Sequence, residues 1–195
     1  MVTEWSALCS PEDPVLVVPW TDPTTNAAFV DLRKNPYDFD EIPEAVQHPP
    51  LLQALRALNA TRSPVFTAKS DVWSLAPEEL EALRLELDLE PNDSRAGAAS
   101  YIDLMFREKT IFTSAAHQQQ WIGRLLRLAS RLDHPNATLE CTLRPALLDL
   151  RAPQEGYAIS LYLKAVGADQ ENAEITWAAA LSDVVQLIRS RELSR

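Results

Sequence analysis

Hydrophobic residues recur with two different periods along this chain, and the two periods predict where strands and helices lie. A period of two favours strands over residues 64–75, 97–108, 137–150 and 156–167, because successive side chains of a strand point to opposite faces. A period near 3.6 favours helices over 49–59, 114–133 and 170–191. Strand pairs and helices are therefore expected to alternate.

The N-terminal part predicts another strand pair and a repeated unit. VLVVPW at 15–20 and AAFVDLRK at 27–34 flank the turn residues TDPTTN, which is the pattern of a hairpin. FVDL at 29–32 resembles YIDL at 101–104, and each would lie in the second strand of a pair. The predicted order is ββα three times over, which makes the ββα unit a candidate repeat.

These elements predict an α+β fold. From the second predicted strand onward the order is βαββαβ, that of a ferredoxin-like core. We expect a largely antiparallel sheet with helices on one face, and a core extended by extra strands and a C-terminal helix. One domain over 1–195 is expected, in which a Pro-rich N-terminal ββα portion at 1–63 packs on a core at 64–195.

The segment 76–93 fits neither period well. Pro77 and the glutamates after it favour a helix start, but leucines then alternate with charged residues. We predict a helical turn followed by an extended connection. Seven acids against one arginine could attract a cation or a basic partner, and the alternative is a solvated insert.

Composition and charge narrow the class of protein. A net charge of −10 over 195 residues disfavours nucleic acid and anionic membrane as partners. There is no apolar run long enough to span a bilayer and no secretory signal pattern, so a cytoplasmic location is expected. Cys9 and Cys141 have no metal-site spacing and are predicted to be reduced thiols, with Cys141 in the core.

Glycine and histidine patterns predict no cofactor and no metal site. Only 4 glycines occur, and no two are close enough to form a phosphate-binding loop or a nucleophile elbow. The 3 histidines have no zinc-ligand spacing.

Polar and aromatic residues gather on one predicted face of the sheet. Strand alternation puts Thr67, Lys69, Asp71 and Trp73 on the same side of strand 64–75, and corresponding positions follow on the other strands. The predicted binding residues are Lys69, Asp71, Trp73, Tyr101, Asp103, Arg144, Tyr162 and Lys164. Aromatic rings supply contact area, and the basic residues could orient a carboxylate or phosphate. An ordinary sheet face with weak ion pairs is the alternative.

Two functions follow from this face. The favoured one is a non-catalytic binding or protein-interaction module, and small-molecule ligands are not excluded. The alternative is a small-molecule enzyme of hydrolase or lyase type, with Asp71 and Asp103 as general acid and base.

One helix carries a second polar feature. His117, Arg124, Arg127 and Arg131, together with Gln120, form a stripe along 114–133. The stripe could dock on an acidic surface, such as the 78–93 segment of the same or another subunit, or be a solvated helix face. We also expect that this chain can self-associate, because the edge strands of an open sheet have unpaired main-chain hydrogen-bonding groups.

Overall fold

The computed structural model describes residues 1–24, 27–90, 94–149 and 151–193. Within these residues the fold is α+β, with one six-stranded mixed sheet and six α-helices. The strands are β1 (Val2–Ala7), β2 (Leu16–Val18), β3 (Val65–Ser74), β4 (Ala96–Phe106), β5 (Ala137–Leu148) and β6 (Gln154–Gly167). The helices are α1 (Pro43–Gln47), α2 (Pro49–Asn59), α3 (Pro77–Glu86), α4 (Lys109–Phe112), α5 (Ala115–Ala129) and α6 (Gln170–Ile188), with a short 3₁₀ helix at Asp38–Glu41.

The sheet has the strand order β1-β5-β6-β4-β3. Both β1 and β2 pair with β5, and β2 does so farther along that strand, after the stretch that pairs with β1. The pairs β3–β4, β4–β6 and β5–β6 are antiparallel, whereas β1 and β2 run parallel to β5. The second strands of two hairpins, β4 and β6, are therefore neighbours at the centre. This order differs from that of a simple ferredoxin-like fold, so that part of the prediction is not supported.

The predicted strand at 27–34 is wrong. This segment makes a single bridge, between Thr21 and Ala28. Asp31 turns the chain instead, because its carboxylate accepts hydrogen bonds from the main chain and the side chain of Arg33, and its carbonyl accepts one from Lys34 N–H. The resemblance between FVDL and YIDL therefore does not mark a repeated strand, since only YIDL lies in the sheet.

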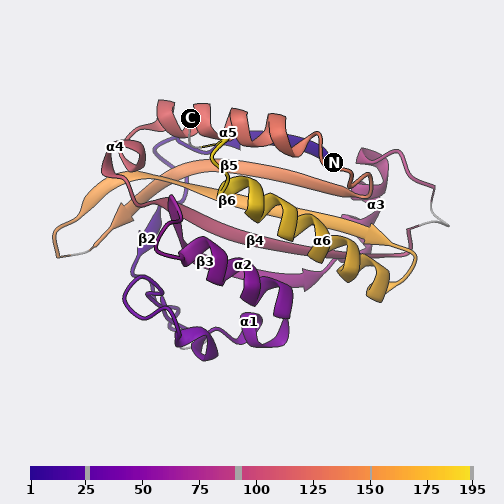
Figure 1. Ribbon diagram of the computed structural model, residues 1–195, viewed down its shortest axis with the longest axis horizontal. Coiled ribbons are helices and arrows are strands. Elements are labelled where there is room, and N and C mark those ends of the chain that lie inside the picture. Colours follow the sequence, from indigo (N-terminus) through magenta and orange to yellow (C-terminus); the bar gives the residue numbers. More distant parts are fainter. Residues whose placement is uncertain (25–26, 91–93, 150, 194–195) are drawn as a thin grey trace.

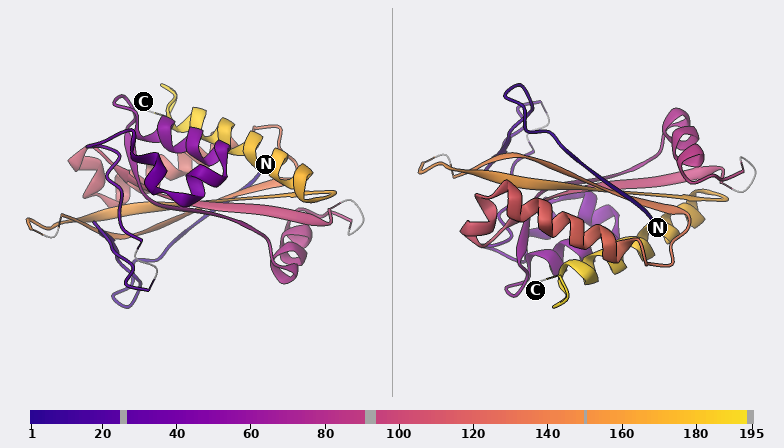
Figure 2. Two further views of the ribbon diagram at one scale, coloured as in Figure 1. Left: turned by 90° about the horizontal axis from the view of Figure 1, so that it is seen from below. Right: turned by 90° about the horizontal axis from the view of Figure 1, so that it is seen from above.

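Four helices cover one face of the sheet. Figure 2 shows α1, α2, α5 and α6 on this side, which we call the covered face, and α3 on the other side, which we call the open face. The loop that follows β2 crosses the open face at the end opposite α3 (Figures 1 and 2). The prediction of helices on one face thus holds except for α3.

The core lies between the covered face and these helices. Trp177 on α6 is fully enclosed, and its indole N–H donates to Ser100 Oγ on β4 over 2.9 Å. Polar side chains define where α5 and α6 begin, because Ser114 and Asp169 accept from the main-chain N–H of His117 and Asn172. The predicted helix at 49–59 is confirmed, and those at 114–133 and 170–191 end a few residues earlier than predicted. No helix among the described residues is long and apolar enough to cross a membrane.

The segment 76–93 forms a longer helix than predicted. α3 extends over ten residues, and Glu79 accepts a hydrogen bond from Ala76 N–H at its start. Leu80 and Leu83 pack on Val166 of the open face, while Leu85 remains 76% exposed. Leucine burial against the sheet therefore overrides the strand-like alternation. Residues 91–93 lie outside the described residues.

A bulge in β3 is anchored by α2. The strand register shifts between Thr67 and Lys69, so Ala68 is an extra residue. Asn59 at the end of α2 donates to Thr67 Oγ1 over 2.7 Å and accepts from Thr67 N–H over 3.1 Å. Thr67 therefore faces the helices, which corrects the prediction that it lies on the polar side, and Phe66 moves to the open face.

Replacing Asn59 tests this anchor. Asn59→Ala leaves the buried N–H of Thr67 without its acceptor and should lower the free energy of unfolding by about 2 kcal/mol. Gln53→Ala, on the exposed side of the same helix, should change it by less than about 0.5 kcal/mol. Urea unfolding followed by circular dichroism measures both, and equal effects would show that the anchor is not needed.

Candidate functional site

Strand pairing aligns the side chains of the open face in rows. One row runs Asp71, Tyr101, Tyr162, Glu140 and Glu4 across β3, β4, β6, β5 and β1. The next row runs Lys69, Asp103, Ser160, Thr142 and Ser6 across the same strands. The open face therefore joins a row of aromatic and acidic side chains to a row of hydroxyls that also holds Lys69 and Asp103.

Three aromatic rings form a continuous band on β3, β4 and β6. The ring centroids of Trp73 and Tyr101 are 6.3 Å apart, and those of Tyr101 and Tyr162 are 5.9 Å apart. All three side chains are half-buried. Burial, with Asp103 nearby, raises the pKa of both tyrosines, so both hydroxyls stay protonated donors at neutral pH.

A buried carboxylate lies beside this band. Asp103 is 0% exposed, accepts from Arg144 Nη2 over 2.7 Å and from Ser160 Oγ over 2.6 Å. Burial raises the pKa of Asp103, while Arg144 and Ser160 oppose that shift. The guanidinium is held in place by Asp103 and keeps a buried Nε–H with no partner among the described residues.

Charges of both signs surround the aromatic band. Lys69 is exposed and lies one row from Tyr101 and Tyr162, whereas Lys164 is half-buried and lies in the row of Trp73, on the other side of the tyrosines. At the α3 end, burial raises the pKa of Glu86, with Glu4 and Glu140 adding to the shift and Lys164 opposing it. A partner would therefore meet an amphipathic surface with localised charges.

The structure brings the predicted residues together on one face. All eight positions lie on the open face by strand register, although they differ in access. Lys69 is exposed, Asp103 is buried, and the other six are half-buried, namely Asp71, Trp73, Tyr101, Arg144, Tyr162 and Lys164. Their role in binding stays a prediction.

The two aspartates of the enzyme hypothesis have separate partners. Asp71 Oδ1 accepts from Val72 N–H over 2.7 Å, whereas Asp103 is engaged by Arg144 and Ser160. Asp71 and Asp103 belong to neighbouring rows, and neither contacts the other. This arrangement gives no support to a coupled acid and base.

The basic stripe on α5 lies on the other side of the molecule. His117, Arg127 and Arg131 are exposed and Arg124 is half-buried. Because α5 covers one face of the sheet and α3 lies on the opposite face (Figure 2), the stripe cannot dock on the acidic helix of its own chain. Docking on another subunit stays a prediction.

Cysteine and metal chemistry add nothing to the open face. Cys141 is buried as predicted, which raises its thiol pKa to about 12, and Cys9 is exposed. Neither forms a disulfide. Among the described residues no group of three or more metal-ligating side chains is found.

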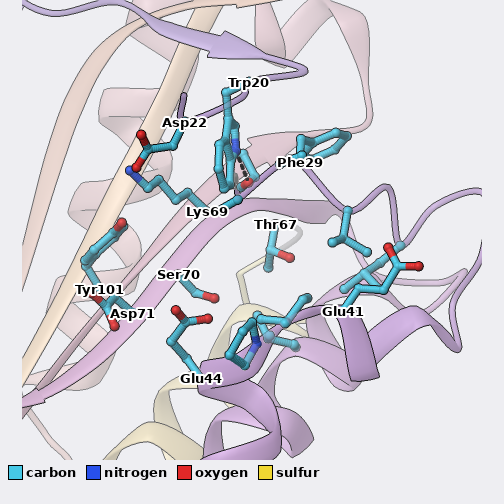
Figure 3. Close-up of a pocket in the computed structure, with 18 residues that line it drawn as sticks. Trp20, Asp22, Phe29, Glu41, Glu44, Thr67, Lys69, Ser70, Asp71 and Tyr101 are labelled. Carbon is cyan, nitrogen blue, oxygen red and sulfur yellow. Dashed lines mark hydrogen bonds between the residues drawn. The ribbon is translucent and has the colours of Figure 1, made fainter. Parts of the chain in front are cut away.

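Sequence patterns did not indicate the cavity of about 710 Å³ next to β3. Its lining includes Trp20, Glu41 and Glu44, and Figure 3 shows these side chains around the strand. Trp20 reaches it through a hydrogen bond from its indole N–H to Ala68 O over 2.8 Å. Because Trp20, Glu41 and Glu44 are far from β3 in the sequence, no local periodicity could show that they surround one cavity.

Comparison with known proteins gives no relative, since no protein-family model, curated protein or solved structure matches this chain. Function must therefore be inferred from the geometry of the site.

The buried carboxylate makes a pH-dependent prediction. Because the folded-state pKa of Asp103 is raised, the native state binds more protons than the unfolded state between the unfolded-state pKa, about 4, and the folded-state pKa, and stability falls as pH rises through this range. Asp103→Asn lacks this loss. We expect wild type to become less stable relative to Asp103→Asn between pH 4 and pH 7.

Urea unfolding at several pH values measures this difference. Asp133→Asn, at an exposed position, controls for the removal of one carboxylate. A relative gain in wild-type stability with rising pH would show that Arg144 and Ser160 outweigh burial.

Proposed function

We propose that this protein is a non-catalytic binding module that holds a protein partner on the open face of its sheet. The observation that carries the proposal is the aromatic band of Trp73, Tyr101 and Tyr162, which crosses three neighbouring strands. Aromatic side chains contribute large contact area with few rotatable bonds and are enriched where proteins bind one another.

The surroundings of the band support a protein surface as the ligand. Lys69 and Arg144 lie beside Asp103, and Lys164 lies near Glu86, so the face offers charges of both signs at several points. Paired charges around an apolar centre favour recognition of one partner over others. Tyr101, Tyr162 and Lys164 lie on β4 and β6, and pairing with a strand on each side holds these two central strands in place.

The enzyme alternative has weaker support. General acid and base catalysis needs two groups that both reach the reacting atoms of one substrate. Asp103 is instead enclosed by its ion pair with Arg144, and Asp71 accepts a hydrogen bond from Val72 N–H of its own strand. We therefore favour binding without chemistry.

Two further proposals concern location and assembly. A cytoplasmic location is supported by two cysteines that form no disulfide. Self-association is supported by the outer side of β1, with which no strand of the described residues pairs and where Trp5 is 46% exposed.

Aromatic truncation tests the main proposal. Tagged wild type and Trp73→Ala are used to capture partners from cells that contain the protein, with quantification by mass spectrometry. A central aromatic residue of an interface contributes about 2 kcal/mol or more, so we expect about 30-fold weaker binding of the specific partner.

Tyr37→Ala is the matched control, since Tyr37 is 84% exposed and lies outside the band. Thermal unfolding verifies that each variant is folded. Equal partner recovery by wild type, Trp73→Ala and Tyr162→Ala would contradict binding at the open face.

A further inference from the structure

The cavity beside β3 passes round the edge of the sheet. Its lining includes Thr67 and Ser70 from the covered face of β3, and Lys69 and Asp71 from the open face. The sheet separates these two faces, so a cavity that contacts both must extend along the outer edge of the strand. Figure 3 shows Glu41 and Glu44 on one side of β3, and Trp20 and Lys69 on the other.

The outer edge of β3 presents main-chain hydrogen-bonding groups that begin at this cavity, with Ser70, and continue beyond it along the strand. Leu75 N–H donates to Gly97 O over 2.9 Å, which fixes the antiparallel alternation so that the main-chain groups of Ser70, Val72 and Ser74 point away from β4. β3 is the last strand of the sheet. Among the described residues, no strand pairs with this outer edge.

Part of the edge already has partners. Ala68 O accepts from Trp20 Nε1, and Val72 N–H donates to Asp71 Oδ1. Ser70 lies between these two contacts and is half-buried, whereas Ser74 lies beyond them and is exposed. The edge is therefore shielded at Ala68 and accessible from Ser70 onward.

The cavity has an acidic lining. Its lining includes four carboxylates, those of Asp22, Glu41, Glu44 and Asp71, and one amine, that of Lys69. The ammonium of Lys69 lies 5.3 Å from the ring centroid of Trp20, so its charge is directed toward the indole. Asp71 and Glu44 lie on opposite sides of β3, and the cavity is acidic on both sides.

We propose that the edge of β3 binds an extended, basic segment of a partner protein as an added strand. This inference rests on the proposed function, because it names the kind of partner segment that the binding module takes. Strand addition would pair the segment with the main chain of Ser70 and Ser74 and with the carbonyl of Val72, because Val72 N–H already donates to Asp71. Adjacent side chains of a strand point to opposite faces, so two consecutive basic residues would reach Asp71 on one side and Glu44 on the other.

The carboxylates and the main-chain edge of β3 have different roles in the proposed binding. Main-chain pairing supplies affinity for any extended segment, whereas the carboxylates on both sides select a basic one. Tyr101 contributes to both the cavity and the aromatic band. A segment bound at β3 would therefore continue directly onto the open face.

A synthetic peptide tests the proposal. The probe is a short fluorescein-labelled peptide in which pairs of arginines alternate with pairs of threonines, and its binding is followed by fluorescence anisotropy. The same peptide with glutamates in place of arginines should not bind. Amide exchange measured by mass spectrometry should slow over residues 68–75 when the basic peptide is added.

Two further peptides separate strand addition from simple charge attraction. One is methylated on alternate main-chain nitrogens, which leaves one edge of the peptide free to pair, and the other is methylated on every main-chain nitrogen, which leaves none. The first should bind normally, and the second should bind at least about tenfold more weakly because it cannot donate hydrogen bonds to β3. Equal binding of both, or equal binding of free arginine and the peptide, would overturn strand addition.

Variants of the protein test the two carboxylates. Glu44→Gln with Asp71→Asn keeps the shape of both side chains and the acceptor for Val72 N–H, and should weaken peptide binding about tenfold. Asp133→Asn with Glu171→Gln makes the same change in net charge at exposed positions and should leave binding unchanged. Equal weakening in both double variants would overturn the site.

The outcome differs from that of the aromatic test. Loss of partner capture in Trp73→Ala without any binding of the basic peptide would overturn this inference and keep the binding module. Peptide binding at β3 with unchanged capture by Trp73→Ala would support the edge site and contradict the aromatic face.

Discussion

The contact between α2 and the bulge of β3 decides how the rest of the sheet edge is arranged. Asn59 satisfies both the side chain and the main-chain N–H of Thr67, and Arg107 at the end of β4 donates to Asn59 O and Val65 O. These buried hydrogen bonds hold the extra residue, Ala68, in place. Since a shift by one residue reverses the faces of a strand, this anchor determines which side chains of β3 meet the open face.

The two faces of the sheet have opposite chemistry because they have different neighbours. On the covered face, β4 and β6 bury aliphatic side chains against α5 and α6, and polar groups such as Ser100 are bonded to the helices. On the open face, α3 covers one end and the loop after β2 covers the other. The uncovered middle can accommodate Tyr101 and Tyr162, because their half-buried side chains remain in contact with water.

Asp103 links structure to the proposed surface. A carboxylate at 0% exposure is costly unless it is paired, and Arg144 together with Ser160 provides that pairing from β5 and β6. The same contacts fix the position of the Arg144 guanidinium on the open face. Buried Asp103 therefore orients Arg144, which is more accessible to a partner.

The sequence by itself determined where β3, β4, β5, β6 and α2 lie, because strands and helices have local hydrophobic periods. It also determined that Lys69, Trp73, Tyr101 and Tyr162 share one face of the sheet, because this follows from the alternation of side chains along each strand. It misplaced residues 27–34, since a single carboxylate, Asp31, stabilises a turn that competes with a strand. It also misjudged α3, whose burial on Val166 is a tertiary contact. Only the tertiary structure decided the strand order, the bulge and the cavity at β3, because each depends on residues far apart in the chain whose contacts have no local period.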